Sequence, residues 1–199
     1  MVDLDSGKSR RRLHDHPSTK AEKNFLPIVE GRPLLSWPKG GNPMPLTIGS
    51  DGIAISHDGK HLYYCPLASR RLYRVRTEAL LDERAGDEEV ARTVEDLGDR
   101  GFASDGLETD DKGRVYLSDY EHNAILRRGA DGHYETLVHD PRVLWPDTLS
   151  LAGDGHLYFT ANQLHRQKLF HDGKDLRAKP YALFRVKVDA GPVLLRGEK

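Results

Sequence analysis

Three aspartates recur at one position of a repeated sequence, and their spacing indicates chemistry at a shared site. The repeats begin S-D-G-I-A-I-S-H-D-G at 50–59, S-D-G-L-E-T-D-D-K-G at 104–113 and P-D-T-L-S-L-A-G-D-G at 146–155. Carboxylates that face one restricted space repel one another unless a cation, an arginine or a proton lies between them. Asp51, Asp105 and Asp147 therefore predict a site for a small ligand, or for calcium or another divalent cation. The structural alternative is that each aspartate caps the N–H groups of its own turn.

Other polar and aromatic residues lie close to these aspartates in the sequence. The full set of predicted ligand-binding residues is Asp51, Ser104, Asp105, Asp119, Trp145, Asp147 and Asn162. An aromatic wall beside carboxylates suits a cationic amine through cation–π contact and charge pairing. This set therefore favours a small-molecule ligand.

The elements that must position these residues are short strands. Each repeat carries a D-G turn between apolar runs, which is a strong hairpin signal. The predicted strands are 52–56, 61–65, 71–76 and 94–98 in the first copy, 106–110, 114–119, 124–128 and 134–139 in the second, and 148–151, 156–162, 182–188 and 192–196 in the third. A four-stranded antiparallel meander is the unit of a β-propeller blade, so the sequence predicts an all-β propeller.

Chain direction places the aspartates together. The connection into the first strand of a blade and the turn between its second and third strands open on the same face, because antiparallel strands alternate in direction. Asp51, Asp105 and Asp147 should therefore surround one mouth of the channel. The turns 66–70, 119–123 and 162–179 should overhang that mouth.

The repeats divide the chain into parts of one partial propeller domain, 1–199. We expect a remnant blade at 1–15, a proline-rich connection at 16–48, and blades at 49–99, 100–140 and 141–199. An insertion at 77–92 predicts one or two short helices, with Thr77 as a helix N-cap. About three and a half blades cannot close a ring of roughly 4–8 blades, so we expect a missing half or self-association.

Composition argues against several partners. A net charge of −1 and a pI near 6.8 give no reason to expect nucleic acid. No apolar run approaches the roughly 20 residues that cross a membrane, and the polar first residues of this sequence do not predict a signal peptide. Cys65 is the single cysteine, so we expect a small buried core residue rather than a disulfide.

Several motifs give the chain a resemblance to a known family. They include the run 49–74, Y-L-S-D-Y-E-H-N at 116–123, W-P-D-T-L at 145–149 and T-A-N-Q-L at 160–164. With them the sequence resembles the major royal jelly/yellow protein family in its bacterial form, over nearly its whole length. The resemblance implies a six-bladed propeller about twice as long as this chain. It also implies a secreted or periplasmic protein whose axial channel binds small amines or other ligands.

A more distant likeness is to the senescence-marker/gluconolactonase propellers, which hold a divalent cation in the channel. Asp51 stands where their motif carries Asn, Asp105 keeps the Asp, and no E-G-P-x-W motif is present. For a metal-dependent lactonase this likeness implies Asp105 as metal ligand and catalytic base, with Asp51 and Asp147 assisting.

Three functional hypotheses follow. The first is a royal jelly/yellow-type propeller that binds a small ligand at the mouth of its axial channel. The second is a metal-dependent lactonase or related hydrolase. The third is a protein-interaction scaffold, which would carry a large exposed apolar patch.

Overall fold

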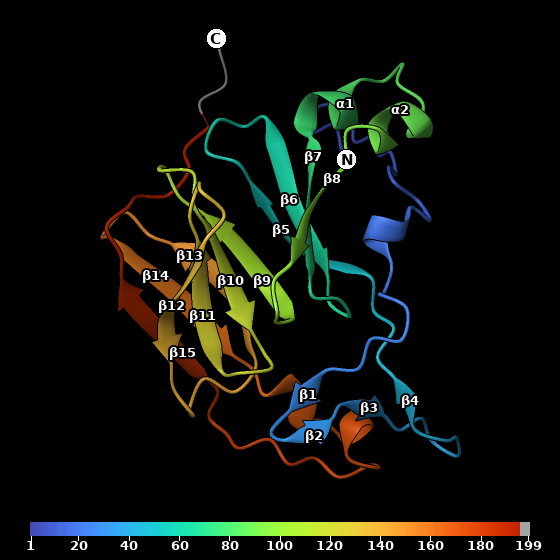
Figure 1. The fold of residues 1–199 in the computed structure, drawn as a ribbon, viewed down its shortest axis with the longest axis vertical. Coiled ribbons are helices and arrows are strands. Elements are labelled where there is room, and N and C mark those ends of the chain that lie inside the picture. The colour runs from blue at the N-terminus through green and yellow to red at the C-terminus, as the bar shows by residue number, and fades with distance from the viewer. Residues whose placement is uncertain (196–199) are drawn as a thin grey trace.

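Three antiparallel β-sheets lie side by side in an arc in the computed structural model, which describes residues 1–195 (Figure 1). The first sheet has the strand order β5-β6-β7-β8, the second β9-β10-β11-β12 and the third β13-β14-β15. The strands are β5 Ser50–Ile55, β6 His61–Pro66, β7 Arg71–Arg76, β8 Glu95–Asp99, β9 Ser104–Thr109, β10 Val115–Asp119, β11 Ala124–Arg128, β12 Tyr134–His139, β13 Pro146–Leu151, β14 His156–Ala161 and β15 Ala182–Lys187. Sheets that follow one another in this way are the blades of a β-propeller.

The turn between the first and second strands of each blade explains the repeated D-G motif. Gly59, Gly113 and Gly155 have φ values of 70°, 77° and 76°, a backbone region that favours glycine. The aspartates of these turns, Asp58, Asp110 and Asp154, accept backbone N–H groups two residues further on. Local chemistry therefore fixes each hairpin before the blades pack.

Two other glycines allow neighbouring blades to approach. A Cβ atom added at Gly52 would lie 2.2 Å from the carbonyl oxygen of Asp105. One added at Gly106 would lie 2.0 Å from the carbonyl oxygen of Asp147. Glycine after the first two repeated aspartates thus brings β5, β9 and β13 together as the inner strands of the arc.

Apolar side chains fill the space between blades. The core between the first and second blades contains Ala54, Tyr63, Cys65, Leu72, Phe102, Leu107, Val115 and Leu117. The core between the second and third contains Tyr116, Ile125, Val143, Leu149, Leu151, Leu157, Phe159 and Val188. Cys65 is fully buried, as the sequence predicts. Alternate residues along the strands reach these cores, which is the pattern of packed sheets.

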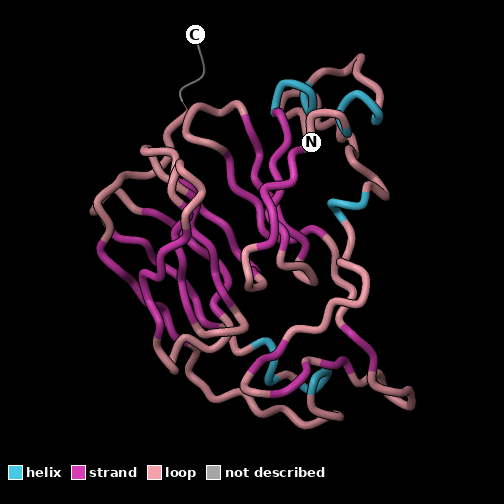
Figure 2. Tube along the Cα trace, viewed as in Figure 1, coloured by secondary structure: helices cyan, strands magenta, loops and turns pink. Residues whose placement is uncertain are grey.

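Residues 16–48 cross one end of the arc, and we call them the strap. The strap carries η1 Pro17–Thr19 and the two-residue strands β1 Ile28–Val29, β2 Arg32–Pro33, β3 Leu35–Ser36 and β4 Met44–Pro45. Its β1–β4 segment lies at the bottom of Figure 1, next to the loop that carries η2 Leu164–Arg166 and η3 Lys168–Phe170. Most of the strap is irregular backbone, as Figure 2 shows.

A separate core holds the strap on the blades. It contains Phe25, Val29, Leu34, Leu46, Leu67, Ala68, Ala103, Tyr120, Trp145 and Phe170. Four of these residues belong to the strap, and the others come from all three blades. The turns predicted to overhang one mouth therefore meet under the strap.

Two short helices interrupt the first blade, as predicted. α1 Thr77–Leu81 and α2 Asp87–Ala91 stand at the opposite end of the arc from β1–β4 (Figure 1). The prediction that Thr77 is the N-cap is wrong, because Arg76 occupies that position. Thr77 Oγ1 instead donates to the carbonyl oxygen of Gly59.

The predicted fourth strand of the third blade, 192–196, is also wrong. Pro192 instead forms a bridge with Asp110 of the second blade, and Arg196 lies outside the described residues. Asp189 makes ion pairs with Lys112, Arg114 and Arg127 of the second blade. These charges draw the segment after β15 across to the neighbouring blade.

The N-terminal segment forms a small hairpin. Val2 and Ser9 make one antiparallel bridge, and no strand is assigned there. Across residues 1–195, no helix is both long enough and apolar enough to span a membrane.

Candidate functional site

The three repeated aspartates converge on a recess of about 190 Å³, which we call the carboxylate recess. Asp51 comes from β5, Asp105 from β9 and Asp147 from β13, each the second residue of its strand. Apolar and small residues complete the lining: Gly52, Ile53, Gly106, Leu107, Thr148 and Leu149. The close approach of the inner strands is what places the three carboxyl groups together.

None of the three carboxyl groups caps its own turn in the part of the chain that the structure describes. Asp105 accepts a hydrogen bond from the indole of Trp145, and Asp147 accepts one from the amide of Asn162. The turn-capping aspartates are those of the D-G turns. Each repeat thus has one aspartate at the start of its inner strand, which faces the recess, and another at its hairpin turn, which caps that turn.

Asp105 is the most buried of the three, with 6% of its surface exposed. Trp145 Nε1 lies 2.7 Å from its Oδ2 atom. Burial, followed by the charge of Asp147 and the proximity of Asp51, raises the pKa of Asp105 to about 8 despite the indole hydrogen bond. At neutral pH this carboxyl group therefore carries a proton.

Asp147 is half-buried and is held from the side by Asn162. The distance from Asn162 Nδ2 to Asp147 Oδ2 is 2.7 Å. Burial and the charge of Asp51 raise the pKa of Asp147, and the Asn162 hydrogen bond partly offsets this. Asp51 is exposed at the edge of the recess. Solvent exposure of the carboxyl groups therefore increases across the recess, from buried Asp105 through Asp147 to exposed Asp51.

Trp145 lies behind the recess and does not form its wall. Its side chain is fully buried, and its backbone has a left-handed φ of 57°. The indole stacks on Tyr120 with ring centroids 4.1 Å apart and planes 11° apart. The indole also stacks with the ring of His165, whose centroid is 5.8 Å away and whose plane is tilted by 17°. A cation–π wall from Trp145 is therefore not available to a ligand in this arrangement.

Two predicted ligand-binding residues lie away from the recess. Ser104 is buried and donates to the carbonyl oxygen of Gly106. Asp119 accepts the backbone N–H groups of Glu121 and His122, and its Oδ2 lies 2.7 Å from His122 Nδ1. Both side chains are occupied in holding the local backbone.

Sequence reasoning missed several residues that support the site. Tyr120 and His165 enclose Trp145, and Glu30 of the strap lies against His165. Tyr120 and His165 stand next to quoted motifs, in Y-L-S-D-Y-E-H-N and just after T-A-N-Q-L. Glu30 carries no local signal, because its contact spans more than 130 residues of sequence.

The predicted cation site is not formed by the side chains as they lie. Within residues 1–195, no three or more His, Cys, Asp or Glu side chains are grouped so that they could hold a metal ion. The oxygen donors suit calcium in kind. However, within residues 1–195 these donors are not grouped closely enough to hold a metal ion. We therefore derive no metal-dependent step.

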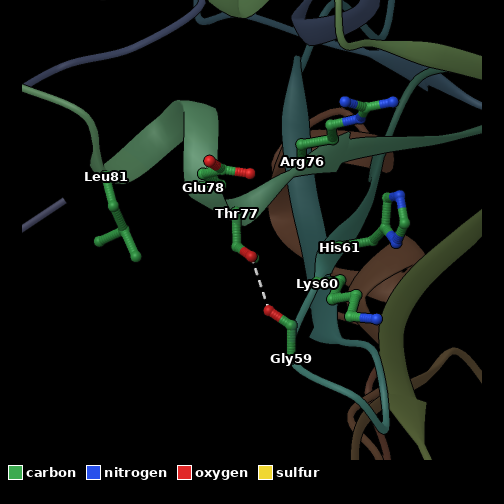
Figure 3. Close-up of a pocket in the computed structure, with 7 residues that line it drawn as sticks. All are labelled: Gly59, Lys60, His61, Arg76, Thr77, Glu78 and Leu81. Atoms are coloured by element: carbon green, nitrogen blue, oxygen red, sulfur yellow. Dashed lines mark hydrogen bonds between the residues drawn. The ribbon is translucent and has the colours of Figure 1, made fainter. Parts of the chain in front are cut away.

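A larger pocket, of about 650 Å³, lies at the other end of the first blade (Figure 3). It is lined by Gly59, Lys60, His61, Arg76, Thr77, Glu78 and Leu81. The hydrogen bond of Thr77 to Gly59 ties the helical insertion to the β5–β6 turn. This pocket lies beside the β5–β6 turn, whereas Asp51 is at the start of β5, and the two pockets share no lining residue, so the pocket is a separate feature.

The arc of blades and the recess at its inner strands define a β-propeller protein. The family model described as major royal jelly protein matches residues 1–190. The chain therefore belongs to the major royal jelly protein family. No curated protein gives a significant match.

Solved structures agree with the fold. A gluconolactonase from Xanthomonas campestris is 24% identical, with a TM-score of 0.52, over 76% of this chain and 48% of that chain. A luciferin-regenerating enzyme is 18% identical, with a TM-score of 0.50, over 76% and 50%. A putative gluconolactonase is 16% identical, with a TM-score of 0.50, over 82% and 55%. The chain thus spans about half the length of these structures, and the likeness concerns the fold alone.

Proposed function

We propose that this propeller binds a small cationic ligand, such as an amine, in the carboxylate recess. The observation that carries the proposal is the convergence of Asp51, Asp105 and Asp147, none of which is occupied by its own turn. Leu107 and Leu149 supply apolar sides for the ligand's carbon atoms. An ammonium group would relieve the mutual repulsion of the carboxylates and displace the proton on Asp105.

Isothermal titration calorimetry tests the proposal with 2-phenylethylamine and its uncharged analogue 2-phenylethanol. We expect heat from the amine only, and binding that survives a chelator. Asp51→Asn and Asp147→Asn should each weaken binding by about tenfold, since each removes one partly exposed charge pair. Asp131→Asn, in the outer turn of the second blade, is the matched control. Equal heats from amine and alcohol would contradict the proposal.

A second candidate function is lactone hydrolysis, favoured by one observation. A buried carboxyl group whose pKa is near 8 is suited to proton transfer at neutral pH, and Asp105 is such a group. In its ionised form Asp105 would take a proton from the attacking water. Turnover of gluconolactone that is lost in Asp105→Asn would support this function. No turnover, with amine binding intact, would leave the binding function alone.

Family membership also supports two wider proposals. We propose an extracellular or periplasmic location, which fractionation of the native organism would test. We further propose that additional blades close the ring around the recess, since the chain spans about half of the propellers that it matches.

A further inference from the structure

The carboxylate recess is connected to the strap by a series of buried side chains. Asp105 accepts the indole N–H of Trp145 at 2.7 Å. The indole is enclosed by Tyr120 and His165. His165 Nε2 lies 3.0 Å from Oε2 of Glu30, which belongs to the strap. The series therefore leads from a carboxyl group of the inner strands to a segment far away in sequence.

His165 has no evident reason of its own to be buried. Its side chain is fully buried, and neither ring nitrogen has a partner with hydrogen-bond geometry within residues 1–195. Burial lowers the pKa of His165 to about 4, so the ring is neutral near pH 7. Burying a neutral imidazole without hydrogen bonds costs desolvation free energy, and only the packing of the ring offsets this cost. The flat imidazole ring stacks with the indole of Trp145, and this contact depends on the ring being planar.

Trp145 in turn needs support from its neighbours. Its left-handed φ of 57° is an unusual backbone conformation for a large side chain, and it persists only where the surroundings fix it. Tyr120 is held by a 2.7 Å hydrogen bond from its hydroxyl group to the carbonyl oxygen of Leu67. His165 packs against Glu30 of the strap, with Nε2 and Oε2 3.0 Å apart, and the Glu30 carboxylate is itself paired with Arg166. The indole thus stacks with one ring that is hydrogen-bonded to the blades and with one ring that packs against the strap.

We propose that His165 is a positioning residue for the carboxylate recess: packed against Glu30 of the strap, it fixes the indole of Trp145 and so the carboxyl group of Asp105. This inference rests on the proposed function only in naming the recess as the binding site. The strap thereby takes part in the site without contacting a ligand. A loop insertion or partner that moves the strap would change the recess.

Hydrogen exchange of the Trp145 indole N–H tests the proposal without any ligand. The chain has two tryptophans, so ¹⁵N-tryptophan labelling gives two indole signals. Trp37, which is 38% exposed on the strap, is the internal reference. Asp105→Ala serves as a reference variant: it gives the exchange rate of a Trp145 indole that has lost its hydrogen-bond acceptor.

We expect His165→Ala to speed Trp145 exchange by about tenfold or more, because an indole that can move opens its hydrogen bond to Asp105 more often. His165→Phe should restore slow exchange, since it keeps a flat ring but no titratable nitrogen. Arg32→Gln, which removes another contact between the strap and His171, is the matched control and should leave exchange unchanged. If His165→Ala does not fold, Glu30→Ala carries the same test, and we expect faster exchange.

Unchanged exchange in folded His165→Ala, or in Glu30→Ala where that variant carries the test, would overturn the proposal. So would failure of His165→Phe to restore the rate in a folded protein. Loss of amine binding with normal exchange effects would refute only the proposed function. Normal amine binding with no exchange effect would refute only the role of His165.

Discussion

At the level of single residues, the environment of Asp105 decides its chemistry. Asp51 and Asp147 share its repeat position, yet only Asp105 is both buried and hydrogen-bonded to an indole. The energetic consequence is a carboxyl group that is neutral when the protein is folded and ionised when it is unfolded near pH 7. Stability should therefore depend on pH through this residue.

The first prediction concerns that pH dependence. The folded pKa of Asp105, about 8, lies above the unfolded value of 3.8, so its contribution is present at low pH and is lost as pH rises toward 8. His165 shifts in the opposite direction and acts only below its unfolded value of 6.5. Urea unfolding should show a loss of about 1–2 kcal/mol between pH 6.5 and 8. Asp105→Asn should remove most of this loss, and an unchanged slope would contradict the assignment.

At the level of elements, glycine sets how closely two blades pack. The inner strands β5, β9 and β13 meet through backbone atoms, where even a methyl group has no room. Gly52 and Gly106 serve this purpose, whereas Thr148 stands at the third copy. At this position β13 therefore lacks the glycine that lets β5 and β9 approach the next inner strand so closely.

The second prediction tests this packing. Gly106→Ala should lower the free energy of unfolding by about 3 kcal/mol, because its Cβ would meet the Asp147 carbonyl oxygen and backbone must move. Gly153→Ala is the matched control: no atom lies within 4 Å of its added Cβ, so the change should be within about 0.5 kcal/mol. Denaturant unfolding measures both. Equal losses of unfolding free energy in the two variants would contradict the prediction that the close contact at Gly106 requires glycine.

Another element-level feature is the carboxylate of Glu121, which joins the strap to two blades. Its side chain is 2% exposed and accepts from Arg70 Nε at 2.8 Å, Ala103 N at 2.9 Å and Ile28 N at 3.0 Å. Removing this charge leaves the Arg70 guanidinium, the buried N–H group of Ala103 and the partly buried N–H group of Ile28 poorly paired. The consequence should be large because several partners depend on one group.

The third prediction follows from that contact. Glu121→Gln should destabilise the protein by about 3 kcal/mol in thermal or urea unfolding. Glu135→Gln, which breaks the more exposed pair with Arg127, should cost about 1 kcal/mol or less. A small effect at Glu121 would mean that the strap is held by its apolar core alone.

At the level of the whole molecule, the first blade stands at one end of the arc, where Leu13, Leu80 and Val90 cover only part of its apolar face. A groove of about 300 Å³ runs along this face, and its lining includes Ile53, Leu62, Tyr64 and Val75. Ile53 is 60% exposed. In a closed propeller a neighbouring blade would cover such a face.

The fourth prediction is that the isolated chain self-associates through this face. Light scattering should show a mass above that of the 22.4 kDa monomer at micromolar concentration. Ile53→Lys should shift the distribution toward monomer without loss of stability, because the residue is exposed. A wild-type chain that stays monomeric, with one sharp unfolding transition, would contradict the prediction.

The sequence alone determined the repeat, the D-G turns and the strands of the first two blades. Those features depend on residues close together in the chain, where turn chemistry and strand pattern act directly. The sequence also identified Asp51, Asp105 and Asp147 as a set, because a repeated position in repeated blades must face the same side.

Tertiary structure decided what the sequence could not. The sequence predicts that Trp145 forms an aromatic wall of the ligand site, but in the structure it is buried and stacks with Tyr120 and His165. The segment after β15 has strand character, yet the charges of the second blade draw Asp189 away from its own sheet. The role of Glu30 depends on a strap contact far away in sequence. Burial, stacking and long-range charge act between segments that only folding brings together, so no local pattern records them.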